Sequence, residues 1–106
     1  MSHTKVNVTD TDAVADAMHF LRDPLDAEQL GFTVVDCEPG WIGKEHDHAE
    51  MGHEEVYFLV SGSATLTVDG EEVPLSPGDA VRVAPDSVRQ IHNGDGESRL
   101  VIAGAP

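Results

Sequence analysis

Positive charge is scarce in this chain. Its 106 residues include 6 Lys and Arg against 20 Asp and Glu, which gives a formal net charge of −14. Phosphate binding needs a basic surface, so the composition excludes nucleic acid as a partner and disfavours an anionic membrane surface. The acidic residues are spread along the whole sequence, as suits a protein hydrated in strong salt. We predict a halophilic source, with an ordinary acidic bacterial protein as the alternative.

Cysteine and long apolar runs are also scarce. Cys37 is the only cysteine, so no internal disulfide can form, and we expect a buried, inert thiol in a reducing compartment. No apolar run approaches the roughly 18 residues of a membrane-spanning helix, and no N-terminal segment has the pattern of a signal peptide. We therefore predict a cytoplasmic protein with no membrane partner.

The spacing of the apolar residues changes near residue 30. Residues 11–23 carry apolar side chains at helical spacing after a capping Thr or Asp, and Pro24 ends the run, which predicts a short helix in an N-terminal arm of residues 1–29. Residues 30–106 contain short runs of period two separated by turn dipeptides, and the segment 68–71 predicts a two-residue hairpin. The length allows one domain, so we predict an all-β antiparallel sandwich or small barrel.

Residue types that bind metals gather between Gly40 and Gly62. A span of ten residues contains His46, His48, His53, Glu54 and Glu55. Imidazoles and carboxylates are ligands of divalent transition metals, and two histidines separated by one residue project from the same face of a strand. This stretch predicts a metal site.

With its strands, glycines and histidines placed, the chain resembles the cupin superfamily over about residues 30–105. The resemblance implies a double-stranded β-helix, or jelly-roll barrel, usually with one metal inside. The first cupin motif runs Gly, five residues, His, one residue, His, three or four residues, Glu, six residues, Gly. Gly40, His46 and His48 fit its first half, and Glu55 and Gly62 fit its second half.

The chain departs from this motif between its two halves. Six residues separate His48 from Glu55, and at the strict spacing His53 would lie close to the place of the acid. We favour Glu55 as the third ligand, because its distance to Gly62 matches the family and because a longer loop costs little while strand register is fixed by burial. His53 remains a candidate ligand or a partner of a ligating histidine.

The second cupin motif, which supplies the last metal ligand, matches poorly. An alignment without gaps puts Arg89 at the place of the ligand histidine, and an alignment anchored on Pro85 puts Gln90 there. The period of a strand allows Arg89 to face inward, or Gln90 together with His92, but not both sets. Arg89 cannot bind a cation but could clamp a substrate carboxylate, whereas His92 could complete a cage of four ligands.

The resemblance implies a protein that binds a small molecule and forms a homodimer. In the first interpretation it is a metal-dependent oxygenase or isomerase, in which His46, His48 and Glu55 hold one Fe, Mn, Ni or Zn ion and Arg89 and Tyr57 contact the substrate. In the second it is a non-catalytic binding or sensing cupin whose metal site is partly lost.

Overall fold

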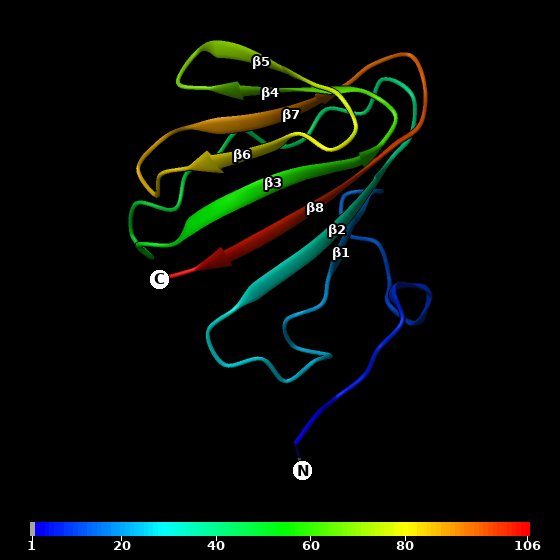
Figure 1. Ribbon diagram of the computed structural model, residues 1–106, viewed down its shortest axis with the longest axis vertical. Coiled ribbons are helices and arrows are strands. Elements are labelled where there is room, and N and C mark those ends of the chain that lie inside the picture. The colour runs from blue at the N-terminus through cyan, green and yellow to red at the C-terminus, as the bar shows by residue number, and fades with distance from the viewer. Residues whose placement is uncertain (1) are drawn as a thin grey trace.

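The computed structural model describes residues 2–106, which form two antiparallel β-sheets packed against each other (Figure 1). The larger sheet has the strand order β1-β2-β8-β3-β6 and the smaller sheet the order β5-β4-β7. The strands are β1 (Met18–Phe20), β2 (Gly31–Cys37), β3 (Glu54–Ser61), β4 (Ala64–Val68), β5 (Glu71–Leu75), β6 (Ala80–Val83), β7 (Arg89–Asn93) and β8 (Ser98–Ala105). The predicted all-β fold is confirmed.

Strand β8 lies at the centre of the larger sheet, between β2 and β3. Its sequence alternates, so that Leu100 and Ile102 are buried while Val101 and Ala103 on the opposite face are only partly covered. The inward side chains of both sheets form one core, in which Leu66 of β4 is completely buried. Alternation of this kind is what a sheet with one buried face requires.

The hairpin between β4 and β5 follows the prediction from its turn residues. Val68 pairs with Glu71, so the connection has only two residues, Asp69 and Gly70. Both have a positive φ, of 49° and 81°, as the tight turns that fit the strand twist require. Asp69 also accepts a hydrogen bond from the backbone N–H of Val88, at 2.8 Å, which ties the turn to the start of β7.

The predicted N-terminal helix is wrong. The only helical element among residues 2–106 is a 3-10 turn, Val8–Asp10. Ala15 and Asp16 have φ values of 52° and 65°, and the segment turns back so that strand β1 pairs with β2. The apolar spacing suited a helix, but pairing to the sheet gives the backbone its hydrogen bonds and buries Ala17.

None of the described residues forms a helix with the length and apolar character that a membrane crossing by helix would need.

The outer face of the larger sheet is apolar at its centre. Val56, Phe58 and Val60 of β3 point away from the core and are 39%, 40% and 45% exposed. Within the five strands, the acidic side chains on this face are Glu54 and Asp36, and each forms an ion pair with an arginine of the same face. This face therefore carries no net charge from its strands, in a chain whose net charge is −14.

Candidate metal centre and pocket

The loop between β2 and β3 places the first histidine of the site. Residues 41–46 run extended beside β7, with bridges that join Ile42 to His92 and His46 to Arg89. His46 and Arg89 exchange two backbone hydrogen bonds, of 3.0 and 2.8 Å. Directly opposed residues of an antiparallel pair put their side chains on the same face, so this pairing brings the His46 imidazole beside the Arg89 guanidinium.

A backbone carbonyl orients the His46 ring. The Nδ1 atom of His46 lies 2.9 Å from the carbonyl oxygen of Lys44. Because a carbonyl oxygen only accepts hydrogen bonds, Nδ1 carries the proton, and the lone pair of neutral His46 is on Nε2. The rings of His46 and His48 lie edge to face, with centroids 5.1 Å apart. The two imidazoles are thus adjacent but not stacked.

Glu55 enters the site from the start of β3. Its Oε1 atom lies 3.3 Å from Nε2 of His48 and accepts hydrogen bonds from the Tyr57 hydroxyl at 3.1 Å and from Nη1 of Arg89 at 2.9 Å. Gly104 of β8 lies behind it, since a Cβ atom at Gly104 would come within 3.0 Å of the Glu55 Cγ and 3.4 Å of Oε2. The carboxylate is therefore held from three sides.

His46, His48 and Glu55 are brought together as a group that could hold a metal ion. Their candidate ligand atoms all lie within 4.8 Å of one another, and within residues 2–106 this group includes neither His53 nor His92. The longer loop after His48 forms a turn, in which Gly52, at φ 67°, donates its backbone N–H to the His48 carbonyl. The geometry favours Glu55 over His53 as the third ligand.

Arg89 and Ile91 lie on the side of β7 that faces the pocket. The sequence alone did not decide which side of this strand faces inward. Arg89 is completely buried, and Ile91 is 6% exposed. The guanidinium donates to Glu55, to the Ser87 carbonyl at 3.0 Å and to the Ala84 carbonyl at 2.6 Å. His92 does not line the pocket, and Gln90 borders it with its side-chain amide donating to Gly43.

Burial sets the protonation of two groups in the site. It lowers the pKa of the His48 imidazole below its ordinary value, against the opposing effect of the Glu55 charge. Neutral imidazole is the form that binds a metal. Burial also raises the pKa of the Tyr57 phenol far above its usual range, and the Glu55 charge adds to this effect. Tyr57 therefore keeps its proton and acts as a hydrogen-bond donor to Glu55.

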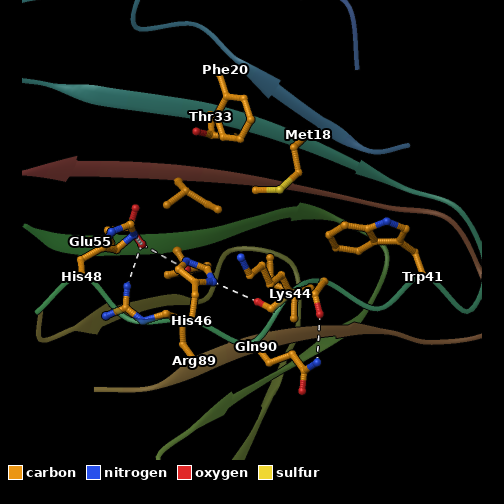
Figure 2. Close-up of a pocket in the computed structure, with 14 residues that line it drawn as sticks. Met18, Phe20, Thr33, Trp41, Lys44, His46, His48, Glu55, Arg89 and Gln90 are labelled. Atoms are coloured by element: carbon orange, nitrogen blue, oxygen red, sulfur yellow. Dashed lines mark hydrogen bonds and ion pairs between the residues drawn. The ribbon is translucent and has the colours of Figure 1, made fainter. Parts of the chain in front are cut away.

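The three residues face a pocket of about 340 Å³. Figure 2 shows Trp41 at one end of this pocket and His48 and Glu55 at the other. Apolar side chains make up much of the wall: Met18, Phe20, Trp41, Ile91 and Ile102. The charged or titratable side chains are Lys44, His46, His48, Glu55, Tyr57 and Arg89.

The lining residues that sequence reasoning missed include Lys44, Met18 and Phe20. Lys44 alternates with His46 and His48, so the same period of two that identified the histidines also indicated Lys44. Met18 and Phe20 alternate in the same way, but the predicted helix concealed this pattern. Both lie on β1, at the edge of the sheet beside the pocket.

The donor set fits a divalent transition metal, with one feature that opposes binding. Two imidazoles and one carboxylate are a known ligand combination for Fe(II) and leave positions open for other ligands. Arg89 holds a positive charge against the same carboxylate. The guanidinium charge would repel a cation held beside it, and a divalent ion twice as strongly as a monovalent one at the same distance. A metal at this site would therefore share Glu55 with the guanidinium.

Comparisons with known proteins agree with this geometry. The family profile described as "Cupin domain" matches residues 33–104. Quercetin 2,3-dioxygenase of Bacillus subtilis (strain 168) is 33% identical over 57 residues, which are 54% of this chain and 17% of the dioxygenase. Glucose-6-phosphate isomerase of Thermococcus gammatolerans is 31% identical over 85 residues, 70% of this chain and 45% of the isomerase. The chain spans less than half the length of either enzyme.

A solved structure extends the likeness to the whole fold. The crystal structure of a cupin protein from Bacteroides fragilis is 27% identical, with a TM-score of 0.80 over 99% of this chain and 85% of that one. The match includes the N-terminal part of the chain, which lies outside the residues matched by the family profile.

Proposed function

The chain belongs to the cupin domain family, and from this premise we propose that it binds one divalent transition metal through His46, His48 and Glu55 and acts on a small organic molecule as an oxygenase or isomerase. The observation that carries the proposal is the convergence of three ligand atoms within 4.8 Å at the polar end of a mainly apolar pocket. Fe, Mn, Ni and Zn all accept such a donor set.

The residues around the site support catalysis by holding the ligands in place. A metal bound here would supply Lewis-acid or redox chemistry to an oxygen donor of the substrate. The Lys44 carbonyl fixes the His46 ring, and Tyr57 and Arg89 fix the Glu55 carboxylate. The apolar wall on the side of Trp41 excludes water from the body of the substrate. We propose that Arg89 positions Glu55; the substrate clamp predicted for Arg89 stays a prediction, as does the substrate contact of Tyr57.

One observation favours the alternative of a non-catalytic binding or sensing cupin. In the alignment without gaps Arg89 stands at the place of the family's last ligand histidine, and it forms an ion pair with Glu55 in the absence of an ion. A carboxylate already paired with a guanidinium binds a cation less tightly. In this second candidate function the pocket holds its small molecule without turnover.

Metal analysis of protein purified without chelator tests the proposal. We expect close to one equivalent of transition metal in the wild-type protein and less than about a tenth in His46→Ala and His48→Ala. His92→Ala is the matched control and should keep its metal, because His92 lies outside the ligand group. Metal-free wild-type protein that gains no metal on dialysis against Fe(II), Mn, Ni or Zn would exclude the enzyme and favour the alternative.

We also propose that two copies associate through the outer face of the larger sheet. The first support is the charge balance of this face. Glu54 and Asp36 are each neutralised by an arginine, so two such faces do not repel. The second support is that an interface would remove the exposed side chains of Val56, Phe58 and Val60 from water, which favours association. A stable interface buries about 800 Å² per partner, so neighbouring strands of the five-stranded sheet would have to take part beside β3.

Light scattering on protein separated by size tests this interface. We expect a dimer for the wild-type chain and a monomer for Phe58→Glu, which would bury a charge at the centre of the face. Met51→Glu is the control, because Met51 is exposed in the turn before β3, outside the strands of this face, and its replacement should leave the dimer intact. A monomeric wild-type chain at micromolar concentration would contradict the proposal.

A further inference from the structure

The pocket concentrates positive charge in a chain that has little of it. Its lining includes Lys44 and Arg89, two of the chain's 6 Lys and Arg, but only Glu55 of the 20 Asp and Glu. Counted from Lys44, Arg89 and Glu55 alone, the lining carries a net positive charge before any metal is bound. A local excess of this sign in an acidic protein favours an anionic ligand.

Lys44 is the cation of the pocket that remains available to a ligand. The Arg89 guanidinium is buried and donates to Glu55 and to two backbone carbonyls. Lys44 is exposed, and within residues 2–106 no ion pair joins its ammonium group to an acid. Its backbone carbonyl holds His46, and Figure 2 shows it beside that histidine. An anionic group paired with Lys44 would thus lie next to the metal ligands.

The rest of the wall limits what the ligand's body can be. Apart from Thr33 and Gln90, this wall is mainly apolar: Met18, Phe20, Trp41 and Ile102 offer no hydrogen-bonding side chain to a ligand, since the Trp41 indole N–H is already donated to the Ala15 carbonyl, at 2.9 Å. A ligand with many hydroxyl groups would leave them unpaired against this wall, at a cost for each. A volume of about 340 Å³ is near the lower limit of small-molecule sites.

A single available ammonium group suits a carboxylate better than a phosphate. A phosphate carries close to two negative charges and three acceptor oxygens, and proteins bind it with several donors. A carboxylate has one charge, which one lysine balances.

We infer that the ligand of this pocket is a small monocarboxylic acid with an apolar or aromatic body, whose carboxylate pairs with Lys44 and whose body packs against Trp41, Met18 and Phe20. The inference rests on the proposed function in one respect, namely that a second polar group of the ligand faces His46, His48 and Glu55. Lys44 acts as the residue that determines specificity for acids over neutral molecules.

Titrations of the zinc-loaded 106-residue chain with three probes test this inference. Benzoate is the model acid, benzamide its neutral counterpart of similar shape, and glucose 6-phosphate a polar anion. Binding is followed by calorimetry and by the emission of Trp41, the only tryptophan of the chain. We expect benzoate to bind more tightly than benzamide and glucose 6-phosphate to bind least.

The chain's two lysines, Lys5 and Lys44, provide a matched pair of variants. Lys44→Gln should weaken benzoate binding about fivefold and leave benzamide unchanged, as expected for the loss of a partly solvated ion pair. Lys5→Gln makes the same change in net charge outside the pocket and should leave both affinities within about twofold of wild type. Equal losses in the two variants, or tighter binding of glucose 6-phosphate than of benzoate, would overturn the inference.

Metal content is measured on the same samples, so that a failure of the proposed ligand class can be distinguished from a failure of the proposed metal centre. A full metal load without benzoate binding overturns the ligand class and leaves the metal centre standing. Benzoate binding that depends on Lys44 in protein that takes up no metal supports the ligand class and overturns the metal centre.

Discussion

The Nη1 atom of Arg89 lies 2.9 Å from Oε1 of Glu55, and the Arg89 side chain is completely buried. The only counter-charge that touches this guanidinium among residues 2–106 is therefore also a candidate metal ligand. On the proposal that Glu55 binds a metal, the stability of the metal-free fold and the affinity for the ion would depend on the same carboxylate.

Replacing Glu55 should destabilise the metal-free protein. Glu55→Gln keeps an oxygen that accepts a hydrogen bond but leaves the buried Arg89 charge without a counter-charge, so we expect the free energy of unfolding to fall by about 3 kcal/mol. Glu54→Gln is the control, since Glu54 and its partner Arg82 are 53% and 61% exposed, and it should cost less than about 1 kcal/mol. Urea unfolding in the presence of chelator measures both; equal losses would show that Arg89 does not depend on Glu55.

Substitution by alanine should lower the free energy of unfolding by a different amount at each of three glycines. At Gly62, with φ 81°, a Cβ atom would overlap the Glu97 carbonyl oxygen and lie 2.8 Å from Cα of Ser98, so Gly62→Ala should cost about 2–4 kcal/mol. Gly70 has the same φ but open space around it, and its replacement should cost about 1 kcal/mol. Gly96→Ala should lie within about 0.5 kcal/mol of wild type. A different order in thermal unfolding would contradict these contacts.

The thiol of Cys37 should make the fold sensitive to alkaline pH. Burial raises the pKa of the Cys37 thiol, so the folded state keeps a proton that the unfolded chain loses above its ordinary pKa of about 8.5. Stability from this group is complete below that pH and is lost as pH rises through the higher pKa of the folded state. Urea midpoints measured between about pH 7 and pH 9.5 should fall less steeply for Cys37→Ala than for wild type. Parallel curves would show that Cys37 does not contribute.

Salt should stabilise the chain. A net charge of −14 repels itself in the compact state, and raising KCl from about 0.1 M to about 1 M shortens the Debye length from about 10 Å to about 3 Å. We expect Tm to rise with KCl. The rise should be smaller in a double variant in which the exposed Glu71 and Glu72 of β5 are changed to glutamine. A Tm that is flat in salt would remove the physical basis of the halophilic setting, which stays a prediction, as does the cytoplasmic location.

Local turn chemistry and strict alternation were readable from the sequence. Asp69-Gly70 specifies a two-residue turn whichever strands it joins, because both residues tolerate a positive φ. His46 and His48 share a face in any extended segment. These features depend on neighbours in the chain, so the predicted hairpin and the pairing of the two histidines needed no tertiary information.

The parts that were wrong or left open depend on contacts distant in sequence. Residues 18–20 form a strand because they pair with β2. This pairing cannot be read from the local sequence pattern. Whether Arg89 or Gln90 faces the pocket depends on how residues 41–46 align with β7. Period two groups the residues of a strand into two faces but does not say which face is inside.

Gly104 has a consequence for the choice of ion. Its missing side chain leaves just enough depth for the Glu55 carboxylate behind the two imidazoles, as a Cβ atom there would lie 3.0 Å from Cγ of Glu55. How far the carboxylate can withdraw is thus fixed by the backbone of the central strand and not by the ligands themselves. On the proposal that Glu55 is a metal ligand, Gly104 would therefore limit the diameter of the ion from behind without touching it.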